Sequence, residues 1–411
     1  MNNNVEVWLW LLMVMGPYNP KSGEILAMCG GDVVRAARLI RDGNCPILSE
    51  SERQNAERIR SKDVQKLLEV CRSNDIRIIT LDDEEYPLRL KAIHNPPVLL
   101  FVRGSLAGLN DELPLAVVGT RNPHEYSIRV GRKIISELAK LGTVIVSGCA
   151  VGLDAAAHRA CLEQGGRTIA VLGCGLLVNY PAENAQLKKD ILATGGALIS
   201  ELPPYTRTFS AYFQHRNRII SGLCVGTLII EASAYSGCLL TAEHTIEQGR
   251  DLFCVPPHDI TDGRFAGVMP LLRDGAIPVF SYIDIVNEYI YGYLRSDGYE
   301  GILTGVNSGM KLRDEGETPK KKKKSPEKAE KPAPAESTEP APEPKTLDES
   351  VFASLDPAEA GILRIICSAP SDIDEVIEKS GMGHLDVTAA LTDLEMFGYI
   401  TRRMDGKYEM A

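Results

Sequence analysis

The sequence predicts an α/β protein whose mostly parallel sheet follows a helical region and precedes a winged helix. Three observations support this fold class. Helical patterns dominate up to about residue 74, short apolar strands alternate with helices over residues 76–280, and three helical patterns followed by a hairpin close the chain. Strands that alternate with helices favour a parallel sheet covered on both faces. The 411 residues suit two to four domains.

Composition excludes a fibrous or wholly disordered chain, because 44% of the residues are hydrophobic and 24% are charged. The formal net charge is −10, so any contact with nucleic acid requires a local basic patch. We expect a helical domain at 1–75, a sheet domain at 76–295, a linker at 296–350 and a winged helix at 351–411.

The N-terminal region contains the apolar stretch Val5–Met15. It is shorter than the roughly 20 residues that span a bilayer, and it lacks the basic start and cleavage site of a signal peptide. We expect a buried helix there, no contact with a membrane, and further short helices up to about Asn74. A strand is expected at Ile76–Thr80.

The sheet domain continues with turns at Tyr86-Pro87 and His94–Pro97 before the stretch Val98–Arg103, and with an amphipathic helix at Ser127–Leu141. The other strands are expected at Leu115–Val118, Thr143–Val146, Thr168–Leu172, Ala197–Ser200, Thr227–Ile230, Leu252–Val255 and Ile277–Val279. Ligands of such sheets bind outside the carboxyl ends of the strands.

The linker at 296–350 is rich in Pro, Lys, Glu and Ala, and we expect a disordered tether. Its lysines Lys320–Lys324 offer a contact for nucleic acid, but a solvated charge run is the more common reading.

The C-terminal domain is expected to be a winged helix, with three helices followed by the strand Tyr399–Arg403, a turn at Asp405-Gly406 and a returning strand. Between Val351 and Ala411 there are 5 basic and 11 acidic residues. This balance disfavours phosphate binding and the hypothesis of a transcription factor that acts through this domain. The acidic balance favours contacts with protein, or with a basic face elsewhere on the same molecule.

Ten cysteines are scattered through the chain without CxxC spacing. We therefore expect no metal site and no disulfide scaffold, and a reducing, cytoplasmic location. The chain also lacks GxGxxG and Walker sequences, so no nucleotide cofactor is expected.

The residues at the strand ends carry the strongest functional signal. Glycine turns let backbone amides approach a ligand, and helix N-termini favour anions, so we predict a phosphate-binding rim. Taken alone, each glycine is more often a simple turn. The residues expected to face a phosphate are Gly119, Thr120, Arg121, Asn122, Gly148, Gly152, Gly173 and Gly175. Asp154, His158, Glu231, Ser236 and Gly237 are expected to be structural at the rim.

A second segment, Phe209–Ile220, places two arginines and an asparagine, Arg216, Asn217 and Arg218, after the aromatic Phe213. Arginine makes bidentate phosphate contacts and an aromatic face stacks on a base. In the alternative interpretation, the aromatic side chains pack in the core and the arginines are solvated without binding a ligand. This segment alone favours neither interpretation over the other.

These motifs, in this order, resemble the DNA-processing protein A family (DprA/Smf). The matching stretches are LAVVGTRNPHEYS, IVSGCAVGLDAAAH, IAVLGCGLLVNYPAENAQL, ISELPP, FQHRNRIISGL, IIEASAYSGCLLTAE and QGRDLFCVPP. The resemblance is dense from Ile76 to Phe280 and weaker in the N-terminal region.

The resemblance implies an extended Rossmann-like sheet that dimerises, a SAM-like N-terminal region and no catalytic activity. It also implies binding and protection of single-stranded DNA without sequence preference, and loading of the RecA recombinase during natural transformation or recombination. By its motifs, the DNA contacts fall on Arg121, on Phe213 with Arg216–Arg218, and on the glycine turns.

The chain departs from the family pattern at several places. Gln214 replaces a proline, and the usual lysine after Tyr180-Pro181 is missing, so we expect Lys188 or Lys189 to substitute for it in DNA binding. Val255–His258 and Asp262–Gly267 also differ, which leaves the local rim geometry open.

An enzymatic alternative is a nucleotide-cleaving Rossmann protein of the phosphoribohydrolase type, echoed by Gly226-Thr227 and Glu231. Its usual PGGxGT turn is absent, which weakens this hypothesis. Asp154 and His158 are spaced like an acid–base pair. We expect them to be structural, with Asp154 capping the helix at Gly152–Leu153 and His158 supporting the glycine turns.

Overall fold

The computed structural model describes residues 4–293, 355–396, 399–403 and 406–410. Contacts group the chain into two compact units, Met1–Arg313 and Asp314–Ala411. The whole predicted linker, 296–350, lies outside the described residues, so the expectation of disorder and the domain boundaries stay predictions.

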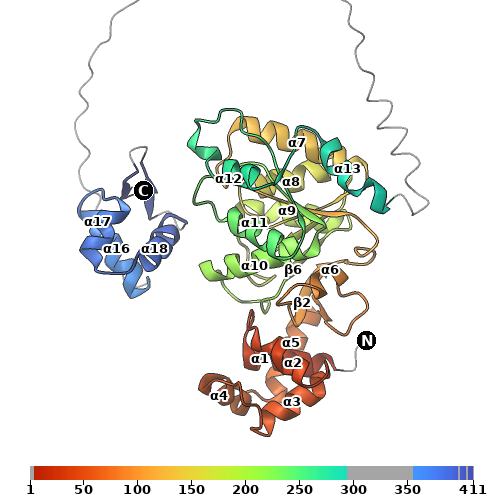
Figure 1. The fold of residues 1–411 in the computed structure, drawn as a ribbon. Coiled ribbons are helices and arrows are strands. Elements are labelled where there is room, and N and C mark those ends of the chain that lie inside the picture. The colour runs from red at the N-terminus through yellow and green to blue at the C-terminus, as the bar shows by residue number, and fades with distance from the viewer. Residues whose placement is uncertain (1–3, 294–354, 397–398, 404–405, 411) are drawn as a thin grey trace, which may run out of the picture. The chain divides into compact units, whose positions relative to one another are not determined.

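The first unit begins with five helices (Figure 1). They are α1 (Val5–Met15), α2 (Lys21–Met28), α3 (Val33–Arg41), α4 (Glu50–Arg58) and α5 (Ser61–Ser73). Helix α1 is apolar around most of its circumference and is largely buried, as its sequence predicts. Asp32 caps α3, and Ser49 with Glu52 forms a capping box on α4, so local polar residues set where these helices start.

The nine-stranded sheet of this unit has the order β1-β2-β6-β5-β4-β3-β7-β8-β9. Strands β3 to β9 pair in parallel, while β1 and β2 form an antiparallel extension beside β6. The strands are β1 (Arg77–Thr80), β2 (Leu99–Gly104), β3 (Pro114–Val118), β4 (Val144–Ser147), β5 (Thr168–Val171), β6 (Ala197–Ser200), β7 (Gly226–Ile229), β8 (Asp251–Cys254) and β9 (Ile277–Pro278).

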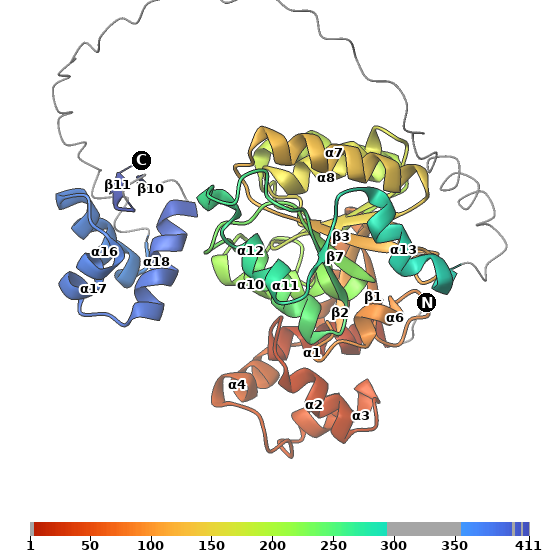
Figure 2. The same ribbon diagram turned by 45° about the horizontal axis from the view of Figure 1, so that its top comes forward.

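Helices cover both faces of the sheet, as the alternating pattern predicts (Figure 2). One face packs against α7 (Glu125–Lys140), α8 (Leu153–Leu162), α9 (Ala185–Ala193) and α13 (Tyr282–Tyr293). The other packs against α6 (Leu88–Lys91), α10 (Ser210–Leu223), α11 (Cys238–Glu247) and α12 (Val268–Arg273). Two short 3₁₀ turns, η1 (Ala182–Asn184) and η2 (Gly263–Phe265), complete the unit.

Alternation along β2 joins the helical region to the sheet. Leu99 and Phe101 lie in one core cluster with the N-terminal helices, whereas Leu100 and Val102 face the cluster beneath α10. Successive strand residues point to opposite faces, so this one strand contributes to both layers.

The second unit has its own small core, centred on Leu363, Val376 and Leu391. Its elements are α16 (Pro357–Ser368), α17 (Ile373–Ser380), α18 (His384–Met396), β10 (Ile400–Arg402) and β11 (Tyr408–Met410). Three helices followed by an antiparallel hairpin confirm the predicted winged-helix pattern.

The predicted fold class is confirmed, and each predicted strand of the sheet is found within one residue of its expected ends. Helix α7 starts two residues earlier than expected, because the side chain of His124 caps it by accepting a hydrogen bond from the Tyr126 amide. No helix within the described parts of the chain has the length and apolar character needed to cross a membrane.

Candidate nucleic-acid interface

The loops after β3, β4, β5 and β7 meet at the carboxyl edge of the sheet, and we call this edge the rim. Strand β3 lies at the centre of the seven parallel strands. Strands β4, β5 and β6 follow on one side of it, and β7, β8 and β9 on the other. Open parallel sheets bind ligands where the strand order reverses in this way. The loop after β3, which carries Arg121, is therefore the expected centre of a site.

Arg121 is exposed on the rim. Within the parts of the chain that the structure describes, its guanidinium has no hydrogen-bond or ion-pair partner. The guanidinium carbon lies 6.0 Å from the ring centre of Phe213. A cation above an aromatic face is held by the ring quadrupole without losing its hydrogen-bond donors. Those donors are thus available to a phosphate.

Phe213 comes from α10 and is half-buried between Arg121 and the turn after β5. A Cβ atom at Gly173 would lie 2.6 Å from the Phe213 ring, so this turn requires glycine for the ring to fit. The ring of Tyr180 stands 5.5 Å from that of Phe213, centre to centre. The aromatic is therefore fixed from several sides.

Arg216 is largely buried, and it lines the same small pocket as Arg121 and Phe213. Its Nη1 donates to the carbonyl oxygen of Gly148, at 2.9 Å, and to that of Val171. A Cβ atom at Gly148 would lie 2.3 Å from this Nη1, which explains the glycine. Burial lowers the pKa of Arg216, and the nearby charge of Asp154 opposes that shift. Arg216 thus ties the ends of β4 and β5 together.

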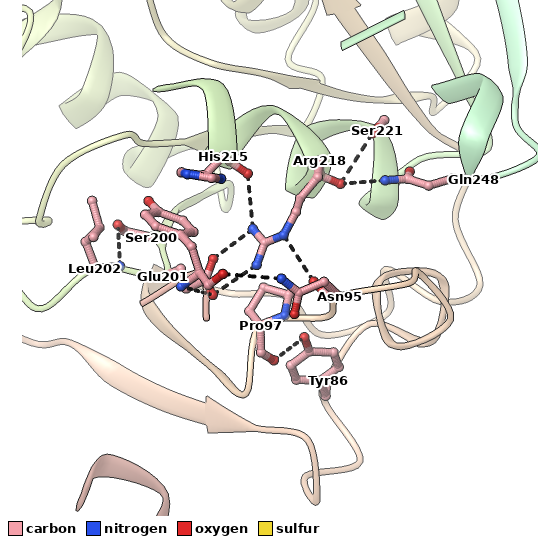
Figure 3. Close-up of polar contacts among 11 residues, drawn as sticks. Tyr86, Asn95, Pro97, Ser200, Glu201, Leu202, His215, Arg218, Ser221 and Gln248 are labelled. Atoms are coloured by element: carbon pink, nitrogen blue, oxygen red, sulfur yellow. Dashed lines mark hydrogen bonds and ion pairs between the residues drawn. The ribbon is translucent and has the colours of Figure 1, made fainter. Parts of the chain in front are cut away.

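Arg218 is also buried, and it forms a two-pronged ion pair with Glu201 (Figure 3). The distances are 2.8 Å from Nη1 to Oε2 and 3.0 Å from Nη2 to Oε1. Its remaining donors reach the carbonyl oxygens of Asn95 and His215. Glu201 also accepts from the amide of Tyr18, in the loop after α1. Arg218 therefore anchors the helical region to the sheet.

Asn217 and Lys188 are buried as well. Asn217 donates to the carbonyl of Gly237, and Lys188 donates to the carbonyl of Tyr180. The neighbouring Lys189 is exposed. The predicted DNA contacts of Arg216, Asn217, Arg218 and Lys188 stay predictions, and their burial disfavours a direct role for them in this conformation.

The other predicted rim residues pack among themselves. The Thr120 amide donates to the Glu231 carbonyl, and the Glu231 carboxylate accepts from the His124 amide. The hydroxyl of Thr120 accepts from the Asn122 amide, and Ser236 contacts Cys238. Added Cβ atoms at three further glycines would collide with atoms of this chain, namely at Gly119, Gly152 and Gly175.

Asp154 does not cap α8, contrary to the expectation from sequence. The N-cap is Gly152, with φ of 84° and no side-chain cap bond. The Asp154 carboxylate instead accepts from the Ala150 amide, 3.3 Å away in the turn before the helix. Burial raises its pKa, against the lowering effect of Arg216. Asp154 is the second residue of α8, so its carboxylate reaches back past the N-cap Gly152 to the Ala150 amide.

His158 is fully buried and bonds to Thr168 at the start of β5, at 2.7 Å, instead of to the glycine turns. Burial, with the charges of Arg159 and Arg216, lowers its pKa to about 3. A buried neutral imidazole has no access to a substrate, which favours the predicted structural role.

The pocket beside Arg121 and Phe213 has a volume of about 30 Å³. That is room for roughly one water molecule, far below the roughly 300–1,000 Å³ of enclosed ligand pockets. A pocket of this size is too small to enclose a nucleotide, so the geometry favours a nucleic-acid strand that lies across the rim.

Sequence reasoning missed three residues that shape the site. Tyr180 lines the pocket, Glu201 neutralises Arg218, and Tyr18 stands over the Arg218 guanidinium at 5.4 Å. Tyr180 and Glu201 lie inside motifs that were noticed. Tyr18 carries no local signal, because its contacts depend on residues far away in sequence.

Comparisons with known proteins agree with this architecture. Residues 77–290 match the family model of the DNA recombination-mediator protein A, and residues 329–406 match that of the DprA winged helix domain. A Synechocystis relative named Protein Smf is 32% identical over 84% of this chain and 82% of its own length.

Among solved structures, DNA processing protein A from Streptococcus pneumoniae is 32% identical, with a TM-score of 0.60. The match covers 69% of this chain and 97% of that one. A Helicobacter pylori DNA processing protein A, whose structure is described in terms of its single-stranded DNA binding mode, is 29% identical. It covers 53% of this chain and 97% of its own, with a TM-score of 0.47.

Proposed function

The chain belongs to the DNA recombination-mediator protein A family, and from this premise we propose that it binds single-stranded DNA on the rim without sequence preference. The observation that carries the proposal is Arg121, an exposed guanidinium next to the fixed ring of Phe213. Binding of this type combines a cation for the backbone with aromatic faces for the bases. Such contacts require no hydrogen bonds to the edges of the bases, so we expect the rim to bind strands of any sequence.

The test is the affinity of Arg121→Ala for a labelled 30-nucleotide dT strand at several salt concentrations. Loss of one phosphate contact weakens binding by about 1–3 kcal/mol and reduces the salt slope by about 1. Arg58→Ala removes an exposed arginine from α4 and serves as the control. Equal affinity and equal salt slope for Arg121→Ala and the wild type would remove Arg121 from the interface.

We further propose that the chain acts in the cytoplasm as a homodimer that protects the strand and loads RecA. Family membership and the ten cysteines, all of them free thiols, support this reading. Two rims on one strand gain effective concentration without new contacts. Light scattering is expected to give about twice the monomer mass, and the protein is expected to speed RecA filament formation on a coated strand.

The proposal holds that the rim is a binding surface without catalysis. The small pocket and the buried His158 support it over a nucleotide-cleaving enzyme. Incubation with nucleoside monophosphates distinguishes the two functions. Release of free base, lost on Asp154→Asn with folding intact, would favour the enzyme.

A further inference from the structure

Two aromatic side chains stand exposed beside the Arg121 pocket. Tyr205 is 64% exposed and Phe209 is 59% exposed, and both lie in the segment between β6 and α10. Large rings in solvent contribute nothing to the core, and grouped exposed apolar side chains commonly mark a binding surface. Arg207, between them in sequence, is exposed as well.

This segment lies against the turn that forms one wall of the pocket. The Gly175 amide donates to the Thr206 carbonyl and the Leu177 amide donates to the Pro204 carbonyl, each at 2.9 Å. Gly173 and Cys174, just before them, line the pocket. Phe209 precedes Phe213 by four residues, about one helical turn along the start of α10. Tyr205 and Phe209 therefore continue the rim beyond Phe213.

The ring of Phe209 is exposed but held in place from behind. It packs edge-to-face on Tyr212, with ring centres 5.6 Å apart. Tyr212 in turn lies 5.7 Å from Tyr18 of the helical region. A ring that is already ordered loses little entropy when a base stacks on it. Through Tyr18 and Tyr212, the helical region thus holds the ring of Phe209 in place.

The charge of the segment suits a polyanion. Residues 202–213 contain no aspartate or glutamate, and they include the exposed Arg207 and four Tyr or Phe side chains. Basic side chains track a nucleic-acid backbone, while aromatic faces stack bases of any kind. An apolar protein partner would match the rings but not the arginine.

On these observations we infer that Tyr205 and Phe209 form a stacking ledge, which holds two bases of the strand next to the nucleotide bound at Arg121. Arg207 contacts the phosphate between them. This inference rests on the proposed binding of single-stranded DNA and assigns the path that the strand takes. The strand runs from Arg121 over Phe213 and then onto Phe209 and Tyr205.

The test compares the full-length wild type with the double variant Tyr205→Leu/Phe209→Leu on two 30-mers, one of dT and one of abasic sugar-phosphate. Leucine keeps apolar bulk but removes the aromatic face. With about 1–3 kcal/mol per stacked base, we expect the double variant to bind dT at least about tenfold more weakly than the wild type. Both proteins are expected to bind the abasic strand equally.

The exchange Tyr205→Phe/Phe209→Tyr keeps both aromatic faces and is expected to bind dT like the wild type. The single leucine variants, each with an intermediate loss, serve if thermal unfolding shows that the double variant is destabilised. Equal affinity of the wild type and the leucine variants for dT would overturn the ledge, while a weaker Arg121→Ala would leave the proposed function standing. A wild type that binds neither strand would overturn both.

Discussion

Three arginines with the same chemistry have different surroundings. Arg121 is exposed above an aromatic ring, Arg216 bonds to strand-end carbonyls, and Arg218 pairs with Glu201. An arginine that is desolvated must satisfy its donors inside the protein, and such a residue is not available to a ligand. At the residue scale, exposure separates the interface arginine from the structural ones.

His158 shows how one proton can be assigned from its neighbours. The Thr168 hydroxyl donates to the Ile145 carbonyl at 2.6 Å, so the Nδ1 of His158 must be the donor to Thr168. Its Nε2 then carries no hydrogen, and it has no partner among the described residues. This neutral tautomer fits a pKa that burial lowers to about 3.

We predict that His158 makes stability depend on pH. The pKa of His158 is about 3 in the folded chain and roughly 6.5 in the unfolded chain. At a pH between these two values, the unfolded chain binds a proton that the folded chain does not. The free energy of unfolding therefore falls as the pH falls below about 6.5. From pH 7.5 to 5.5 the loss is about 1 kcal/mol. Urea unfolding should show the full loss in the wild type and in His94→Phe, which changes an exposed histidine, and a smaller loss in His158→Phe, where His215 still has a pKa that burial lowers. An unchanged pH slope in His158→Phe would contradict the assignment.

At the scale of elements, α10 separates two roles on two faces. Phe213 and Arg216 face the pocket, whereas Tyr212, His215 and Arg218 face Tyr18 of the helical region. Residues three and four apart share one helix face, so the dense motif of this helix serves the rim and the anchor at once.

We predict that Glu201→Gln destabilises the first unit strongly, because it leaves Arg218 charged and buried without its counter-ion. Breaking a buried pair costs about 3–5 kcal/mol. The exposed pair Arg77–Glu85 is the control, and Glu85→Gln is expected to cost about 1 kcal/mol or less. Denaturant unfolding measures both, and similar small losses would mean that Arg218 is solvated.

At the scale of the whole molecule, the winged helix is poorly suited to phosphate. Two basic residues of its hairpin region are already paired, Lys407 with Glu375 at 2.9 Å and Arg403 with Glu409 at 3.4 Å. The third helix of this unit, α18, carries Asp386 and Glu395 and no lysine or arginine. These features favour a protein partner for this unit.

We therefore predict that a chain ending at Leu312 keeps most of its affinity for short single strands. The first compact unit, Met1–Arg313, contains the entire rim. Titration of this chain and the full chain against one labelled 30-mer at fixed salt should agree within about tenfold. A larger loss, about 1.4 kcal/mol or more, would assign DNA binding to the linker or the winged helix.

Most of the element order and the place of the site could be predicted from the sequence. Strand and helix periods, glycine turns and the carboxyl-edge rule are local or topological, so they led to the rim and to Arg121. The helix caps were less predictable. Asp154 was assigned to a cap that Gly152 occupies, since the choice depends on a turn conformation with positive φ.

The fold class, the winged-helix pattern and the arginine-rich segment follow from the sequence, because apolar periodicity and residue type act over short stretches. Which arginines reach solvent depends on long-range packing. Arg218 is buried because Glu201 and Tyr18, 183 residues apart, meet beside it. The exposed rings of Tyr205 and Phe209 likewise depend on long-range packing, since burial is set by what folds over a side chain and not by its neighbours in sequence.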